Sequence, residues 1–266
     1  MSVKQQIMTL RRAWEIQRRV IFALLMREVL TRFGRHNIGF LWMFAEPMMF
    51  TLGITALWTA SGAHQSSDLP ITVFALTGYS SVLLWRNMPA RAISSIQPNL
   101  ALMYHRNVKL FDIFFARLLL EAVGATMSFF MLSLIFIYIG WVDPPEDVLK
   151  VIAGWILLTW FGMALAIFLG ALSEHSELVE KFWHPTAYFL FPLSGAGFLL
   201  EILPEKAREL LLYIPMLNCV EYVRDGYFGS HFHAYYSVSY VIVFNCVLSL
   251  LALAKLREVS RTVIPK

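Results

Sequence analysis

The sequence predicts an all-α polytopic membrane protein with six transmembrane helices, and its composition and long apolar runs support this fold class. Of the 266 residues, 58% are hydrophobic and only 15% are charged, and the mean hydropathy is +0.61. A soluble domain usually carries about 25% charged residues. About 20 apolar residues in a helix span the hydrocarbon core of a bilayer. Backbone polar groups in lipid must be satisfied within their own segment, so the spans are expected to be helices.

We expect the first 38 residues to form a cytoplasmic, amphipathic interface helix ahead of the first span. Apolar residues recur at helical spacing within residues 4–33, at Ile7, Leu10, Trp14, Ile21 and Leu25. Basic residues lie beside this stripe, and their long side chains can reach lipid phosphates. The pattern favours a helix that lies on the anionic inner leaflet, with a solvated cytoplasmic helix as the alternative.

Six segments are long and apolar enough, or nearly so, to cross the membrane. They are residues about 39–60, 70–88, 112–139, 148–172, 183–200 and 235–254. Lys and Arg concentrate before the first span, after the second and after the sixth, whereas the loop after the first span has none. Because basic residues favour the cytoplasmic side, both termini are predicted to be cytoplasmic. Residues 39–266 are therefore interpreted as one transmembrane domain.

Residues 201–233 form a separate feature between the fifth and sixth predicted spans. The segment is too polar to cross as one helix, and Pro204 and Pro215 divide it into short pieces. We expect two short re-entrant helices that enter from the periplasmic face. Backbone at such depth is tolerated only against protein or a water-filled cavity. An interfacial hairpin on the outer surface is the alternative.

Three ionisable residues inside predicted spans are candidate functional residues. Glu46 precedes Pro47 in the first span, where the proline frees a backbone carbonyl. Arg117 and Glu121 are four residues apart in the third span, so they can meet on one helix face as a local structural pair. Glu46 and Glu121 are the acids that an intramembrane enzyme would use, but no sequence feature orients them as acid and base.

A basic collar follows the second span at the predicted cytoplasmic mouth. Its members are Arg86, Arg91, Arg106 and Lys109, with no acidic residue between them. Such a collar anchors to anionic lipid or steers an anionic substrate headgroup, and the two roles are compatible. Most tryptophans fall near span ends, as in an aromatic belt, although some of them, with Tyr79, could line a conduit for sugar rings.

The sequence lacks motifs for ATP binding and for metal binding. It holds no G-x-x-x-x-G-K-[ST] loop, so ATP is not expected to bind here. The histidines and the two cysteines show no metal-ligand spacing, and Cys219 and Cys246 are interpreted as small apolar residues. The net charge of +4 follows from the cytoplasmic bias of the basic residues, so no nucleic acid is implied. We expect no cofactor and no metal on this chain.

A set of motifs occurs in a fixed order along most of the chain. The first group is Leu25-Met26-Arg27-Glu28, Thr31-Arg32-Phe33-Gly34, Ile38-Gly39-Phe40-Leu41-Trp42 and Glu46-Pro47. The later groups are residues 94–99, Tyr104, residues 106–109 and 116–121, then residues 214–218 with Glu221 and Arg224. Together they resemble the ABC-2-type permeases, and more specifically the permease subunits of Gram-negative capsular polysaccharide exporters. Cys219 departs from the pattern, because many relatives carry proline there.

The resemblance implies an ATP-driven exporter of capsular polysaccharide on a phospholipid anchor with an acidic sugar linker, in the bacterial inner membrane. It implies a homodimer paired with two copies of a separate ABC ATPase, which would bind ATP and Mg. Further partners would be a periplasmic co-polymerase-type adaptor and an outer-membrane polysaccharide export channel. An exporter of O-antigen or teichoic acid is an alternative, and an intramembrane enzyme acting on lipid-linked sugars is an alternative from a different class.

The resemblance and the charge pattern together assign roles to particular residues. The substrate headgroup would be met by Arg32, Arg35, Arg86 and Arg91. A coupling helix in the loop at about 96–109 would contact the ATPase through Pro98, Asn99, Leu102, Tyr104 and Arg106. The re-entrant helices would cap the conduit and would carry Pro215, Asn218, Glu221 and Arg224.

Overall fold

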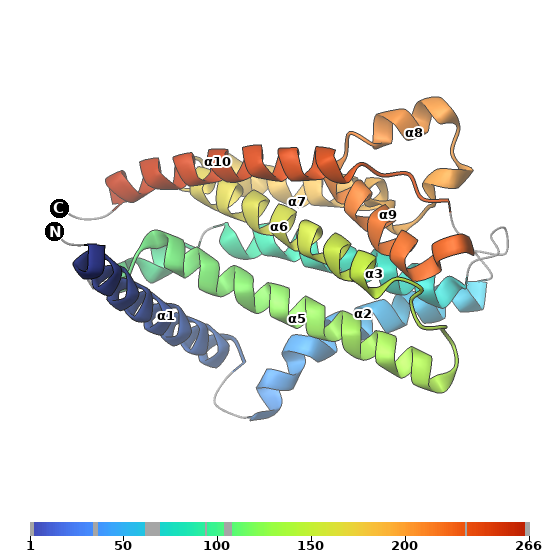
Figure 1. The fold of residues 1–266 in the computed structure, drawn as a ribbon, viewed down its shortest axis with the longest axis horizontal. Coiled ribbons are helices and arrows are strands. Elements are labelled where there is room, and N and C mark those ends of the chain that lie inside the picture. The colour runs from blue at the N-terminus through green and yellow to red at the C-terminus, as the bar shows by residue number, and fades with distance from the viewer. Residues whose placement is uncertain are drawn as a thin grey trace.

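The computed structural model describes residues 3–33, 37–61, 70–93, 95–103, 108–231 and 233–263, and every regular element in these ranges is a helix. The long helices run side by side along the length of the molecule (Figure 1). They are α1 (Val3–Phe33), α2 (Asn37–Ser61), α3 (Ile71–Ala92), α5 (Leu110–Ile139), α6 (Val148–Ser173) and α10 (Val238–Val263). The start of α1 and the end of α10 lie at the same end of the bundle (Figure 1).

Within the described ranges, four helices are long and apolar enough to cross a membrane. Their apolar stretches are Leu41–Ser61, Leu110–Ile139, Val148–Ser173 and Val238–Thr262. These correspond to the first, third, fourth and sixth predicted spans. Helix α3 covers the second predicted span with 22 residues, but it carries Arg86, Asn87 and Arg91 in its second half and is less apolar.

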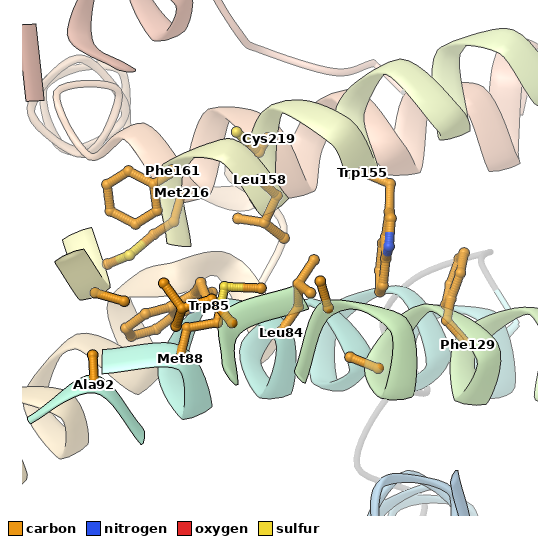
Figure 2. Packing of buried hydrophobic residues seen from close by; sticks show 14 of the residues in the cluster. Leu84, Trp85, Met88, Ala92, Phe129, Trp155, Leu158, Phe161, Met216 and Cys219 are labelled. Atoms are coloured by element: carbon orange, nitrogen blue, oxygen red, sulfur yellow. The ribbon is translucent and has the colours of Figure 1, made fainter. Parts of the chain in front are cut away.

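Helix α3 forms the centre of the bundle and packs against α2, α5 and α6. Trp85 and Met88 of α3 are fully buried and lie near Leu158 and Phe161 of α6 (Figure 2). Gly162 of α6 permits this close approach, because an added Cβ would lie 3.2 Å from the Cα of Trp85. Interiors packed at this density tolerate little added volume.

The turn between α5 and α6 follows from its sequence. Helix α5 ends at Gly140, whose φ of 77° lies in the left-handed region that glycine occupies at low cost. Helix α6 begins after Asp147, whose side chain accepts a hydrogen bond from the backbone N–H of Lys150 at 3.1 Å. The backbone N–H of Asp147 donates to the carbonyl of Gly226, which ties this turn to helix α9 (Pro215–Phe228).

The fifth predicted span, residues 183–200, coincides only in part with a helix. Helix α7 (Leu178–Phe191) starts earlier and has 14 residues, and it is followed by the short π-type turn η2 (Pro192–Ala196). Gly195 has φ 80°, which ends the helical path before residue 200. Helix α7 begins before the apolar run that defined the predicted span, because polar residues also form part of its first turns.

The polar segment after α7 folds into short helices, as the two prolines predicted. They are η3 (Leu200–Ile202), α8 (Glu205–Leu211), α9 and η4 (Gly229–His231). Pro204 caps the start of α8, and Pro215 is the first residue of α9, where its missing N–H costs no hydrogen bond. Helix α8 has no buried residue, whereas most of α9 is buried against α6, α3 and α10. Both lie at the end of the bundle opposite the termini (Figure 1).

Candidate functional site

A polar cleft of about 130 Å³ lies among α1, α2, α3 and α5. Its polar lining residues come one from each helix: Arg32, Glu46, Asn87 and Glu121. Gly124 lies at its base, where an added Cβ would come within 2.9 Å of the side chain of Met43 on α2. The cleft thus combines a cation, an amide and two carboxylates in a mostly apolar bundle. Ionisable groups in such a setting are functional candidates.

Glu121 joins three helices at this cleft. Its Oε1 atom forms ion pairs with Nη1 of Arg32 on α1 and, at 3.1 Å, with Nε of Arg91 on α3. The Glu121 side chain is 10% exposed and that of Arg32 is 20% exposed, whereas that of Arg91 is 47% exposed. One carboxylate oxygen therefore separates two like charges that would otherwise repel each other.

The predicted local pair between Arg117 and Glu121 is wrong. Arg117 instead pairs with Glu28 of α1, with 2.9 Å between its Nε and the Glu28 Oε1, and its Nη1 donates to the carbonyl of Arg91 at 3.3 Å. The four-residue spacing allowed a contact within α5, but α1 supplies partners for both charges. Spacing along one helix could not show this, because the competing charges lie about 90 residues away in the sequence.

Helix α1 packs along α5 in the parallel direction, as the order of its polar contacts shows. Gln17 contacts Asp112, Glu28 pairs with Arg117, and Arg32 pairs with Glu121. The predicted helix at residues 4–33 is confirmed, and Trp14 of its apolar stripe is 70% exposed. Polar and charged residues of α1 thus face the bundle.

The four residues predicted to meet the headgroup do not form one cluster. Arg32 and Arg91 converge on Glu121 at the cleft. Arg86 lies elsewhere, with its guanidinium 4.6 Å from the ring centroid of Tyr188 on α7. Arg35 lies outside the described residues. Asn87 and Gly124 line the cleft and were missed, because an amide and a small residue in a helix carry no distinctive sequence signal.

Glu46 and Pro47 both line the cleft on α2, which continues as a helix through Pro47. Glu46 is exposed, and it makes no ion pair with the other residues that the structure describes. It therefore shares the cleft with Glu121 but differs from it in having no cationic partner there.

The segment between α3 and α5 contains the predicted coupling residues. It forms η1 (Gln97–Asn99) and α4 (Leu100–Met103), in which Pro98 is exposed and Leu102 is half-buried. Asn99 is buried, donates to the carbonyl of Ser95 at 2.8 Å and accepts from Nη1 of Arg27 on α1 at 2.7 Å. Tyr104 and Arg106 lie outside the described residues.

The same segment is also tied to the turn after α6. The Gln97 amide donates to the Glu174 carboxylate, while Asn99 holds α1 on the other side. Because of these two hydrogen bonds, a displacement of η1 would also shift α1 and the α6–α7 turn.

A second polar group lies on α9, at the opposite end of the bundle. Asn218 donates to the carbonyls of Leu212 and Ile214 at 2.8 and 3.0 Å and accepts from the backbone of Ser237 at 2.9 Å. Pro215 is buried at the first position of the helix. Asn218 thus fixes the entrance of the chain into α9 and its exit toward α10.

Glu221 and Arg224 are fully buried on α9 and pair with each other at 3.6 Å. Arg224 donates from Nη1 to the carbonyl of Phe198 at 3.0 Å, and its guanidinium lies 4.1 Å from the ring centroid of Phe74 on α3. These contacts connect α9 to α3 and to the turn after α7.

Tyr79 is buried, with 5% of its surface exposed, inside an aromatic cluster. Its ring centroid lies 6.0 Å from that of Phe50, 5.3 Å from that of Trp58 and 5.6 Å from that of Phe191. This cluster packs α2, α3 and α7 together. In the isolated chain Tyr79 therefore acts as a packing residue.

The apolar helices and the charged cleft define the class: a polytopic helical membrane protein whose sequence contains no phosphate-binding ATP loop. Residues 19–228 match the model of the ABC-2 type transporter family. The chain belongs to this family of membrane proteins.

Curated relatives match nearly the whole chain. The capsule polysaccharide export inner-membrane protein CtrC of Neisseria meningitidis serogroup B is 41% identical over 95% of this chain and 97% of its own length. The capsule polysaccharide export inner-membrane protein BexB of Haemophilus influenzae is 39% identical over 97% of both chains. The polysialic acid transport protein KpsM of Escherichia coli is 25% identical over 93% of this chain and 96% of its own length.

Proposed function

We propose that this chain is the transmembrane subunit of an ATP-driven exporter that moves lipid-anchored capsular polysaccharide across the inner membrane. The observation that carries the proposal is the similarity, over almost the full length, to inner-membrane proteins named for capsule polysaccharide export. Membership of the ABC-2 type transporter family supports a transport role. The absence of a G-x-x-x-x-G-K-[ST] loop from the sequence supports ATP hydrolysis on a separate ATPase chain.

The proposed topology has six spans with both termini in the cytoplasm. Helix α3 would be the second span, and α7 with η2 would be the fifth. The common location of the start of α1 and the end of α10 supports an even number of crossings. Helices α8 and α9 would be the re-entrant pair on the periplasmic side. The burial of α9 supports this placement, because backbone at membrane depth must be covered by protein or line a cavity.

The proposed assembly is a homodimer with two ATPase chains, a periplasmic adaptor and an outer-membrane channel. The η1–α4 segment would dock on the ATPase through its exposed residues, which include Pro98. Its bonds to α1 and to the α6–α7 turn support a role in transmitting movement from the ATPase into the bundle. ATP would shift the dimer between states that it binds with different affinity.

The cleft at Arg32 and Arg91 is the proposed contact for the anionic headgroup. Guanidinium groups bind phosphate and carboxylate oxygens in a planar, bidentate geometry. Arg86 would contribute at a distance, and Arg35 is proposed to contribute with it, by raising the local concentration of an anionic substrate. The partial exposure of Arg91 supports access from outside the cleft.

Deletion of the gene, followed by its reintroduction, tests this proposal. Capsular polysaccharide should disappear from the cell surface and accumulate inside as a lipid-linked chain, and the wild-type gene should restore export. Loss of O-antigen or teichoic acid with normal capsule would show that the chain belongs to one of the alternative exporters. Turnover of a lipid-linked sugar by the isolated chain, without the ATPase, would favour the alternative that the chain is an intramembrane enzyme.

A further inference from the structure

Arg32 in the cleft and Arg91 beside it are already paired with a carboxylate of the same chain. Arg32 and Arg91 come from different helices and converge on the single Oε1 atom of Glu121. An anion in the cleft would meet Arg32 in its lining and would lie near Arg91, which pairs with the same oxygen of Glu121. Because Glu121 is 10% exposed and lies in a mostly apolar bundle, its attraction to them is screened less than at an open surface.

A phosphate and a carboxylate compete for the same donors. Each guanidinium offers its N–H groups in a fixed plane, and both anions accept them in the same way. The cleft of about 130 Å³ has Arg32 and Glu121 in its lining, so an anion placed there lies beside the existing pair. A zwitterionic headgroup carries its own cation, which would disfavour exchange with Glu121.

We propose that Glu121 is an internal counter-anion that competes with the phosphate of a lipid headgroup for Arg32 and Arg91, and so sets the affinity and charge selectivity of the cleft. The inference rests on the proposed function, which identifies the anion as part of a lipid-anchored substrate. Exchange would release α1 and α3 from α5 at this point. Because Arg27 of α1 also holds Asn99 of η1, occupancy of the cleft would be transmitted toward the docking segment.

Binding of short-chain phosphatidylglycerol to the full-length chain in detergent micelles tests the proposal. Glu121→Gln removes the competing charge and should raise the affinity for phosphatidylglycerol roughly tenfold, the scale of one charge-assisted contact. Affinity for phosphatidylcholine should not change. Adding Arg32→Gln to the first substitution should abolish the gain, because one of the two released guanidinium groups is then missing.

Glu205→Gln is the control, because it removes one carboxylate from an exposed position on α8, away from the cleft. It should change phosphatidylglycerol affinity by less than about twofold, since it frees no guanidinium. An equal gain in this variant would show a general change in potential and would overturn the proposal. An equal gain for soluble glycerol 3-phosphate in Glu121→Gln would overturn the assignment to a lipid headgroup.

If Glu121 has a purely structural role, Glu121→Gln should not raise the affinity for phosphatidylglycerol. In that case Glu121→Gln leaves two arginines in repulsion and lowers affinity, or leaves it unchanged, and either result refutes competition. If Glu121→Gln does not fold, Glu121→Asp retains the charge but shortens its reach, and it should give a smaller gain in affinity; no gain would refute the proposal. The assay needs neither the ATPase nor the polysaccharide, so failure of the export test would leave its result standing.

Discussion

Replacing Arg224 with glutamine tests the energetic role of the buried charges on α9. The substitution removes the hydrogen bond to the carbonyl of Phe198 at 3.0 Å, the contact with the Phe74 ring at 4.1 Å and the ion pair with Glu221 at 3.6 Å. A hydrogen bond to a charged group contributes about 1.5–3 kcal/mol. The variant also leaves Glu221 fully buried without its cation, and breaking such a pair costs about 3–5 kcal/mol in total.

Glu221→Gln should lower the stability less, by about 1–2 kcal/mol, because Arg224 keeps its contacts with the Phe198 carbonyl, the Phe74 ring and the Thr77 hydroxyl. The double variant should cost less than the sum of the single variants by at least about 1 kcal/mol, because the second change removes the stranded charge. This difference is the coupling free energy between the two side chains.

Reversible unfolding of the purified chain by SDS in mixed micelles, followed by tryptophan fluorescence, measures these free energies. A loss below about 1 kcal/mol for Arg224→Gln, or strict additivity in the double variant, would refute the reasoning.

Three further predictions concern packing and coupling. Asn99→Ala removes the hydrogen bond that holds η1 to Arg27 of α1, together with the one to the Ser95 carbonyl. It should reduce ATP hydrolysis by the assembled complex at least about threefold without preventing assembly, as checked by ATPase activity and size-exclusion chromatography. Gly162→Ala brings a methyl carbon within 3.2 Å of the α3 backbone and should cost about 1–3 kcal/mol, whereas Gly53→Ala, with nothing within 4 Å, should be neutral or stabilising in the same unfolding assay. Cys219→Ser places a hydroxyl in a buried site and should cost about 1–3 kcal/mol of stability, while Cys246→Ser at an exposed position should change stability little. Equal effects within the glycine pair or within the cysteine pair would contradict the described packing.

Much of the fold could be predicted because apolar run length is a local property of the sequence. The helices at the first, third and fourth predicted spans begin and end close to the expected residues, whereas α10 continues past residue 254, where the sixth predicted span ended, to Val263. Pro204 and Pro215 also marked the starts of α8 and α9, since proline restricts the backbone wherever it occurs. The fifth span was misjudged because the turn at Gly195 lies within an apolar run, where hydropathy does not detect it.

The site was harder to predict because its contacts connect distant segments. Glu121 is recognisable in the sequence as a charge inside a span, but its partners come from α1 and α3. Helical spacing favoured Arg117 as the partner, whereas tertiary packing pairs Arg117 with Glu28. The basic collar likewise looked continuous in the sequence, yet Arg86 and Arg91 point to different neighbours, Tyr188 and Glu121.

Transport by purified protein tests the central claim most directly. The chain is reconstituted in lipid vesicles with its ATPase, and lipid-linked capsular polysaccharide is supplied on the ATPase side. Polysaccharide should become protected inside the vesicles only when ATP and both chains are present. Transport without the ATPase, or none in a complex that binds the substrate and hydrolyses ATP, would contradict this claim.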